Sequence, residues 1–126
     1  MNGEIKRIMV VEDELLIQMV SRQMLENAGY MVCCTTTSGE EAVEMALERR
    51  PHLILMDIKL DGEMDGITAM EEIKKVVDIP VLYVSGNSDE ATMKRVQKTS
   101  MVDFVVKPVD YHLLMRKIDE FFKNNP

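Results

Sequence analysis

Five polar side chains stand at the ends of short apolar runs or directly after them, and together they could carry out phosphoryl transfer. They are Glu12, Asp13, Asp57, Ser85 and Lys107. Two or three carboxylates a few ångströms apart repel one another unless a cation lies between them. Oxygen ligands with water in the remaining positions suit Mg²⁺. A carboxylate nucleophile, a metal, a hydroxyl and an ammonium are the groups that transfer of a phosphoryl group requires.

The elements that must bring these residues together alternate along the chain as apolar runs and amphipathic helical patterns. We expect strands over residues 6–11, 30–35, 52–57, 81–85 and 102–106. We expect helices over 14–28, 38–49, 66–77 and 89–98, and a last helix that Asp110 caps and that runs to about residue 122. Strict alternation of strand and helix predicts a parallel sheet between layers of helices.

The composition of the strands indicates their order in the sheet. Those centred on Val10, Leu55 and Leu82 are nearly continuous apolar runs, as expected when helices cover both faces. The second and fifth strands are more polar and are expected at the edges. Right-handed crossovers then predict an α/β, flavodoxin-like fold: a doubly wound five-stranded parallel sheet of order 2-1-3-4-5 with five helices on both faces. Its ligand crevice opens between strands one and three, at the strand ends that carry the polar residues.

Length and composition indicate one globular domain. The 126 residues are 46% hydrophobic and 29% charged, so we expect a single domain over 1–126 with its core at about 5–122. With 15 basic and 22 acidic side chains the net charge is -7, which disfavours nucleic acid and anionic membranes as direct partners. No apolar run is long enough to span a membrane, and residues 1–4 lack a signal-peptide pattern, so we expect a cytoplasmic protein.

Cys33 and Cys34, the two cysteines of the chain, are adjacent in the second expected strand. Neighbouring side chains on a strand point to opposite faces of the sheet. An intramolecular disulfide between them is therefore implausible, and we expect both thiols to stay reduced.

The first expected helix has a clear apolar pattern. Leu16, Met19, Val20 and Met24 share one of its faces. Most of the twelve methionines occupy positions of this kind, and we expect Met19, like Met9, to fill space in the core rather than to form a binding surface.

The arrangement of motifs resembles the receiver domain of two-component response regulators. Five segments carry the resemblance: Val10–Glu14, Leu53–Asp57, Met64–Gly66, Val84–Gly86 and Phe104–Pro108. Each motif is weak alone, but five at these spacings are very specific. The resemblance covers the chain from about residue 5 to residue 122 and implies the CheY-like form of the flavodoxin-like fold.

The resemblance implies a role for each acidic residue. Asp57 would accept a phosphoryl group from a sensor histidine kinase or a histidine phosphotransfer protein. Asp13 and Asp57 would bind Mg²⁺ (or Mn²⁺) directly, with the backbone carbonyl of Lys59 as a third ligand. Glu12 would act largely through water. For Glu12 and Glu14, a solvated position at the start of a helix is an equally good interpretation.

The resemblance also implies how the phosphoryl group is held and read. The Ser85 hydroxyl would bind a phosphoryl oxygen, and Lys107 would pair with Asp57 and then with its phosphate. Phe104 occupies the switch-aromatic position, where the family often has a Tyr, and it swings inward when the hydroxyl moves toward phosphate. Phe lacks the Tyr hydroxyl, so a readout that needs this hydrogen bond is not expected. The Lys107–Pro108 bond is expected to be cis.

The implied output is an altered surface on the fourth helix, fifth strand and fifth helix. A downstream protein target, a linked output domain or a second copy in a phosphorylation-dependent dimer would read it. We expect no enzymatic activity beyond self-phosphorylation and autodephosphorylation. Nothing after residue 122 suggests an output domain, so the chain is expected to be a stand-alone receiver or the receiver piece of a longer protein.

The fourth expected helix departs from the usual pattern. Its apolar positions are few: Ala91, Met93 and Val96. Many receivers have Gly-Ala where this chain has Ser100 and Met101, so the helix end lacks a residue that adopts a left-handed conformation at low cost. Both features predict low local stability for this helix.

Two other functions are compatible with the fold class. A flavodoxin-like module that binds a flavin or nucleotide would need a loop rich in Gly, Ser or Thr after the first strand, and this chain has Glu12–Glu14 there. A receiver that binds partners without phosphorylation would be marked by loss of Asp57, Asp13 or Lys107, and all three are present.

Overall fold

A parallel sheet in the strand order β2-β1-β3-β4-β5 runs through the computed structural model, which describes residues 4–126. The strands are β1 (Arg7–Val11), β2 (Met31–Thr36), β3 (Leu53–Asp57), β4 (Val81–Ser85) and β5 (Asp103–Val106). The helices are α1 (Leu15–Asn27), α2 (Gly39–Arg49), α3 (Gly66–Lys74), α4 (Glu90–Gln97) and α5 (Tyr111–Asn124). The flavodoxin-like fold and the predicted strand order are confirmed. The expectations for the start of the chain, including the lack of a signal peptide, fall partly on residues 1–3, which lie outside the described residues.

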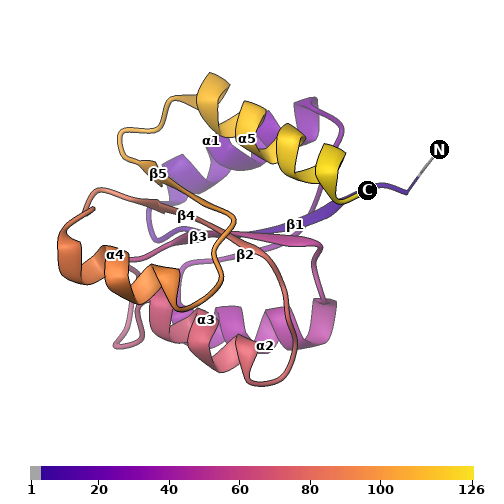
Figure 1. Ribbon diagram of the computed structural model, residues 1–126. Helices are drawn as coiled ribbons and strands as arrows, with labels where there is room; N and C mark the ends of the chain where they lie inside the picture. Colours follow the sequence, from indigo (N-terminus) through magenta and orange to yellow (C-terminus); the bar gives the residue numbers. More distant parts are fainter. Residues whose placement is uncertain (1–3) are drawn as a thin grey trace.

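Helices cover both faces of the sheet and enclose two apolar cores. α1 and α5 lie on one face, and α2, α3 and α4 lie on the other (Figure 1). Successive side chains of a strand point to opposite faces. Ile8 and Val10 therefore pack toward α1 and α5, whereas Met9 and Val11 pack toward α2 and α3. Every residue of β3 and β4 is buried, which is why these two segments read as continuous apolar runs. No helix among residues 4–126 combines the length and apolar character needed to cross a bilayer.

Capping side chains set the starts of the later helices, as the sequence predicts. The Ser38 hydroxyl accepts a hydrogen bond from the Glu41 N–H at 3.2 Å, and Asp110 accepts from the backbone N–H groups of His112 and Leu113. Such contacts satisfy backbone donors that a first helical turn leaves unpaired. The largest boundary error is in α3, which ends at Lys74 instead of residue 77. Beyond Lys74 the N–H groups of Lys75 and Val76 bond carbonyls three residues earlier, as in a 3₁₀ turn, instead of four.

The expected core face of α1 is wrong. Leu16 is 74% exposed and Met19 is 65% exposed, so neither fills the core. Ser21 and Leu25 are the buried residues of this helix, and the Ser21 hydroxyl lies 3.4 Å from the Tyr111 hydroxyl of α5. A helical apolar stripe shows that a helix is amphipathic, but it does not distinguish a core face from a face left for a partner.

The expectation that Cys33 and Cys34 point to opposite faces is also wrong. Val32 pairs with Ile8 of β1, but Cys34 pairs with the next β1 residue, Met9. Cys33 is therefore an extra residue in β2, and the resulting β-bulge breaks the alternation of side chains. Both thiols pack against the core on the α2 side, with their sulfur atoms 3.4 Å apart, and both are free.

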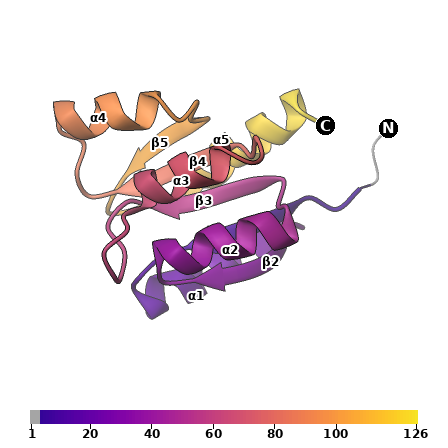
Figure 2. The same cartoon turned by 90° about the horizontal axis from the view of Figure 1, so that it is seen from below.

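α4 is weakly anchored, and it lies at the β5 end of its layer (Figure 2). Val96 is its one buried residue, whereas α3 has five. Met93 is partly buried against the same core, and polar contacts add to the attachment of α4. Arg95 forms an ion pair with Asp65 at 2.9 Å, and Thr99, just after α4, contacts the buried Tyr83 hydroxyl at 2.7 Å. The low local stability of α4 therefore stays a prediction, with a physical basis in its small apolar contact.

Hydrogen exchange measures this difference directly. In the native protein, we expect the amides of residues 90–97 to exchange at least about tenfold faster than those of residues 66–74, because fewer buried apolar side chains oppose local opening. Equal protection of the two segments would contradict the prediction.

The backbone after α4 provides a second test. Ser100 has φ 55°, a left-handed conformation that a residue with a Cβ adopts at a cost. We expect Ser100→Gly to raise the free energy of unfolding by about 1 kcal/mol in urea titrations. The control is Lys98→Gly, since Lys98 has φ -74° and Gly there should lower stability instead. A Ser100→Gly protein no more stable than wild type would show that the position is not strained.

Candidate functional site

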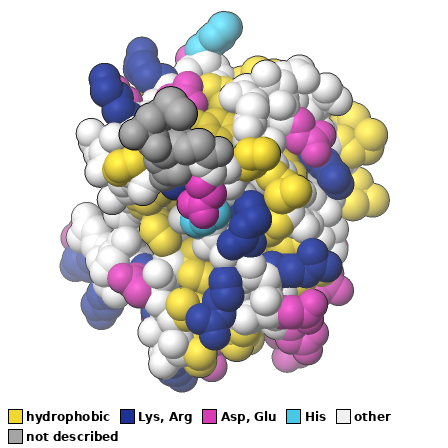
Figure 3. All heavy atoms as spheres, turned by 90° about the vertical axis from the view of Figure 1, so that its right-hand side faces the viewer, with side chains coloured by type: hydrophobic (Ala, Val, Ile, Leu, Met, Phe, Trp, Pro, Cys, Tyr) yellow, Lys and Arg dark blue, Asp and Glu magenta, His cyan; other side chains and the backbone are white. Residues whose placement is uncertain are grey.

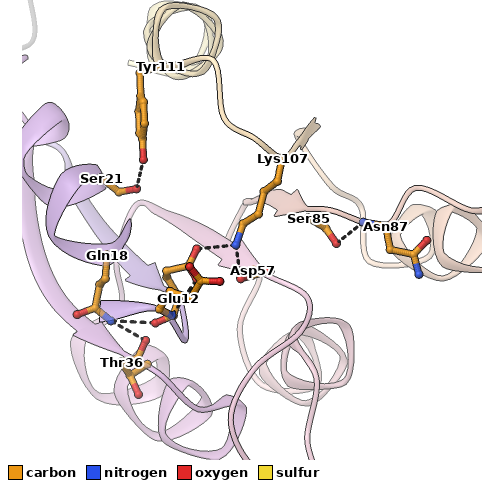
Figure 4. A network of polar contacts seen from close by, with 10 residues as sticks. Glu12, Gln18, Ser21, Thr36, Asp57, Ser85, Asn87, Lys107 and Tyr111 are labelled. Atoms are coloured by element: carbon orange, nitrogen blue, oxygen red, sulfur yellow. Dashed lines mark hydrogen bonds and ion pairs between the residues drawn. The ribbon is translucent and has the colours of Figure 1, made fainter. Parts of the chain in front are cut away.

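The carboxyl ends of four strands bring the expected polar residues together at one edge of the sheet (Figure 4). A cleft of about 290 Å³ opens there, and it includes most of the predicted site. Its lining residues are Asp13, Glu14, Asp57, Lys59, Ser85, Gly86, Asn87 and Lys107. Glu12 is buried beside the cleft, and Phe104 does not line it.

The Lys107 ammonium joins two carboxylates from different strands. It donates to Asp57 Oδ2 at 2.8 Å and to Glu12 Oε1 at 2.9 Å. Asp57 and Glu12 are only 4% and 5% exposed, so their charges are largely removed from water. The Lys107–Pro108 peptide bond is cis, as expected. Two buried carboxylates that share one cation form a compact charged centre at the end of the sheet.

A third carboxylate completes an acidic cluster. Oxygen atoms of Glu12, Asp13 and Asp57 all lie within 4.8 Å of one another. Three carboxylates at this spacing are the donor set that a hard divalent cation such as Mg²⁺ prefers. Asp13 is half-buried and faces the cleft, so a cation could reach the cluster from solvent.

Burial dominates the electrostatics of this cluster. It raises the pKa of the Glu12 carboxyl to about 7, because loss of water outweighs the hydrogen bonds donated by the Glu14 N–H and Lys107. Burial also raises the pKa of Asp57, although the Lys107 hydrogen bond and charge oppose it. For Lys107, burial favours the neutral amine, but the hydrogen bonds and charges of Asp57 and Glu12 raise its pKa above the ordinary value. The charged forms of these carboxyls are thus poorly solvated, and a cation bound beside them would stabilise those forms.

A glycine fixes the backbone beneath Asp57. A Cβ on Gly66 would lie 2.1 Å from the Asp57 carbonyl oxygen, so no other residue fits here without displacing the strand end. The Gly66 N–H donates to the Ile58 carbonyl at 2.7 Å, which closes the loop between β3 and α3. The start of α3 is therefore packed directly against the backbone of Asp57.

Two positioning contacts were not predicted from the sequence. The Gln18 side-chain amide donates to the carbonyls of Glu12 and Thr36, both at 3.1 Å, and ties the β1–α1 loop to β2. Gln18 interrupts an apolar run, and this signal could have identified it. Asp65, the cap of α3, also accepts two hydrogen bonds from Arg95 of α4, and no local pattern indicates that pair. The Arg95 and Thr68 contacts lower the pKa of Asp65 despite its partial burial.

The two residues expected to act in switching lie in different surroundings. Ser85 is buried at the end of β4, and its hydroxyl accepts a hydrogen bond from the Asn87 N–H at 3.2 Å. Phe104 is half-buried and packs against the core on the α2 and α3 side. Their roles stay predictions.

The opposite end of the sheet has a different surface. Several Lys and Arg side chains gather near the middle of that face, among apolar ones (Figure 3). Arg7 begins β1 at this end of the sheet, and its guanidinium donates to the carbonyls of Arg49 and Arg50 at the end of α2. The acidic cluster and this basic surface therefore lie at opposite ends of the strands.

Known proteins share both the sequence pattern and the fold. The response regulator receiver domain family matches residues 8–119. The chemotaxis protein CheY of Thermotoga maritima is 35% identical over 104 residues, which cover 82% of this chain and 86% of that protein. A protein-glutamate methylesterase/protein-glutamine glutaminase of Archaeoglobus fulgidus is 38% identical over 104 residues, 81% of this chain and 30% of that protein. The chain spans between 30% and 57% of the length of several curated relatives.

Two solved structures agree with this relationship. The CheY-like receiver domain protein of Methanospirillum hungatei superposes with a TM-score of 0.89 at 26% identity, covering 96% of each chain. The signal receiver domain of a modulated diguanylate cyclase from Desulfovibrio desulfuricans has a TM-score of 0.84 at 30% identity, covering 93% of each chain.

Removal of the Lys107 ammonium, which Asp57 and Glu12 share, should destabilise the metal-free protein. We expect Lys107→Met to lower the free energy of unfolding at pH 8 by about 1–3 kcal/mol, because two buried carboxylates lose their partner. Glu12 has a raised pKa of about 7 in the folded protein, so its protonation stabilises the fold as the pH falls from 7 toward the unfolded value of 4.5. Lys107 lowers this pKa, so in Lys107→Met the pKa of Glu12 should rise further and the variant should gain more from protonation than wild type. The deficit of Lys107→Met should therefore shrink over that range.

Urea titrations from pH 5 to pH 8 in EDTA would measure this effect. The exposed Lys98→Met is the control, and it should stay within about 0.5 kcal/mol of wild type at every pH. If Lys107→Met equals wild type at pH 8, the ammonium does not compensate the buried carboxylates.

Proposed function

Because this chain belongs to the response regulator receiver domain family, we propose that it is a phosphorylation-dependent signalling switch with Asp57 as the phosphoacceptor. The phosphoryl group comes from a sensor histidine kinase or a histidine phosphotransfer protein. One observation carries the proposal: a buried Asp57 shares the Lys107 ammonium with Glu12, next to a third carboxylate on an open cleft. The loop after β1, Glu12–Glu14, lacks the Gly, Ser or Thr residues that hold a flavin or nucleotide phosphate, which argues against such a ligand.

Divalent metal is the proposed cofactor of the reaction. Asp13 and Asp57 would hold Mg²⁺ (or Mn²⁺) directly, together with the backbone carbonyl of Lys59, and Glu12 would act through water. The donor set fits, since these carboxylates provide hard oxygen ligands whose mutual repulsion a cation relieves. When bound, the metal neutralises charge on the transferring phosphoryl oxygens.

Three side chains of the cleft, Asp57, Lys107 and Ser85, have different roles in the proposed reaction. An Asp57 carboxylate oxygen attacks phosphorus, the bond to the donor breaks, and the leaving group departs with the bonding electron pair. Lys107 orients Asp57 before transfer and afterwards pairs with the phosphoryl oxygens that Asp57 carries. Ser85 supplies a hydroxyl donor to another of these oxygens once it turns from its contact with the Asn87 N–H.

The proposed output is a change in the surface of α4, β5 and α5. Movement of Ser85 toward phosphate would leave space that Phe104 fills, and α4 would adjust because it is held by little apolar contact. A downstream protein target, a linked output domain or a second copy would read the changed surface. The ion pair between Arg95 and Asp65 links α4 to the loop that follows the phosphoacceptor.

The exposed apolar face of α1 is the proposed docking surface for the phosphodonor. Leu15, Leu16 and Met19 are each more than 60% exposed and follow directly on the acidic loop of the site. A donor protein bound there would present its phosphohistidine to the cleft. We propose that this exchange takes place in the cytoplasm and that residues 1–126 form a single receiver domain. Its proposed activity is limited to self-phosphorylation and autodephosphorylation, and we propose no direct contact with nucleic acid or membrane.

Incubation with acetyl phosphate and Mg²⁺, followed by intact mass measurement, tests the proposal. Wild type should gain one phosphoryl group, because Asp57 can displace acetate from phosphorus, and EDTA should prevent the gain. Asp57→Asn should gain none. The matched control is Asp61→Asn, an exposed carboxylate in the same loop, which should behave as wild type. A phosphorylated Asp57→Asn protein, or an unmodified wild type, would reject Asp57 as the phosphoacceptor.

A further inference from the structure

The bulge in β2 creates a pair of thiols that the phosphoacceptor site does not use. β2 is an edge strand that lies beside α2 (Figure 2). The Sγ atoms of Cys33 and Cys34 lie 3.4 Å apart on the same face of this strand. Both residues are partly exposed and partly buried against the core on the α2 side. Adjacent cysteines in a regular strand would not form such a pair, since their side chains would point apart.

The two thiols differ in acidity, which favours binding of a soft ion. The hydrogen bond from Cys34 lowers the pKa of the Cys33 thiol to about 7. Partial burial raises this pKa, and the positive charges of Arg7 and Arg49 lower it. The same contact raises the pKa of Cys34. A thiolate is the reactive and metal-binding form of cysteine, so Cys33 provides one ligand near neutral pH and Cys34 a second when its proton is displaced.

The sulfur separation is closer to that of a pyramidal centre than to that of a tetrahedral or linear one. With sulfur–ion bonds of about 2.3 Å, tetrahedral coordination would require sulfurs about 3.8 Å apart and linear coordination about 4.6 Å. The observed 3.4 Å corresponds to an angle of about 95° at the ion, which is the pyramidal geometry of a trivalent main-group centre.

We propose that Cys33 and Cys34 form a chelating site for a thiophilic ion of pyramidal geometry, with trivalent arsenic as the matching class. Phenylarsine oxide is the probe. Both thiol protons pass to the arsenic-bound oxygen, which leaves as water, and two arsenic–sulfur bonds form while the arsenic–carbon bond stays. Arsenic and sulfur keep their oxidation states, so no oxidant or reductant is needed. The site is independent of Asp57 and of phosphorylation.

Intact mass measurement under native conditions tests the chelate. Wild type should gain one phenylarsenic group and keep it through a wash in excess monothiol, and a small dithiol should remove it. The second bond forms intramolecularly, so retention should exceed that of a single thiol by about 100-fold. Cys33→Ser and Cys34→Ser should each lose this advantage, and circular dichroism should show that their folds are retained.

Moving the pair of cysteines by one residue tests whether chelation depends on the bulge or only on two cysteines being adjacent in the sequence. In Cys33→Ser combined with Thr35→Cys, the thiols at 34 and 35 are again adjacent, but their partners Met9 and Val10 lie on opposite faces of β1. This variant should release the group as quickly as the single-cysteine proteins. Retention equal to wild type in the shifted pair would overturn the proposal, as would a wild type that takes up no arsenic or releases it like a single thiol.

Discussion

The shared ammonium of Lys107 is the interaction on which the site depends. Burial removes Glu12 and Asp57 from water at the ends of adjacent strands, and their repulsion would oppose folding without a nearby cation. The lysine that offsets it follows β5, at the far side of the sheet in both sequence and topology. The two hydrogen bonds it donates therefore require that β1, β3, β4 and β5 be assembled in this order.

The surroundings of the acidic cluster combine a fixed part and a loosely held part. On the fixed side, Gly66 packs α3 against the Asp57 backbone and Gln18 ties the acidic loop to β2, so the carboxylates keep their positions. On the other side, α4 buries one residue and depends on polar contacts with Asp65 and Tyr83. A change of charge at Asp57 would act between these parts. This difference in anchoring gives the proposed switch a physical basis.

Departures from the sequence-based expectations have local physical causes. The apolar stripe of α1 is real, but it is exposed, and Ser21 and Leu25 occupy the contact with the rest of the fold. The alternation rule fails at Cys33 because one extra residue is inserted in β2. In both cases the pattern of residue types is present, but packing against α5 or pairing with β1 decides which side chains are buried or meet.

The amino-acid sequence by itself determined the element types, the strand order and the set of polar residues at the strand ends, because these follow from local periodicity and from the handedness of crossovers. It also indicated the strained position after α4, where Ser100 is left-handed. Only the tertiary structure decided which face of α1 is exposed, that Cys33 and Cys34 meet, and that Arg95 binds Asp65. These depend on register and on side chains from separate elements, and such contacts arise only when the complete sheet and its helices are packed together.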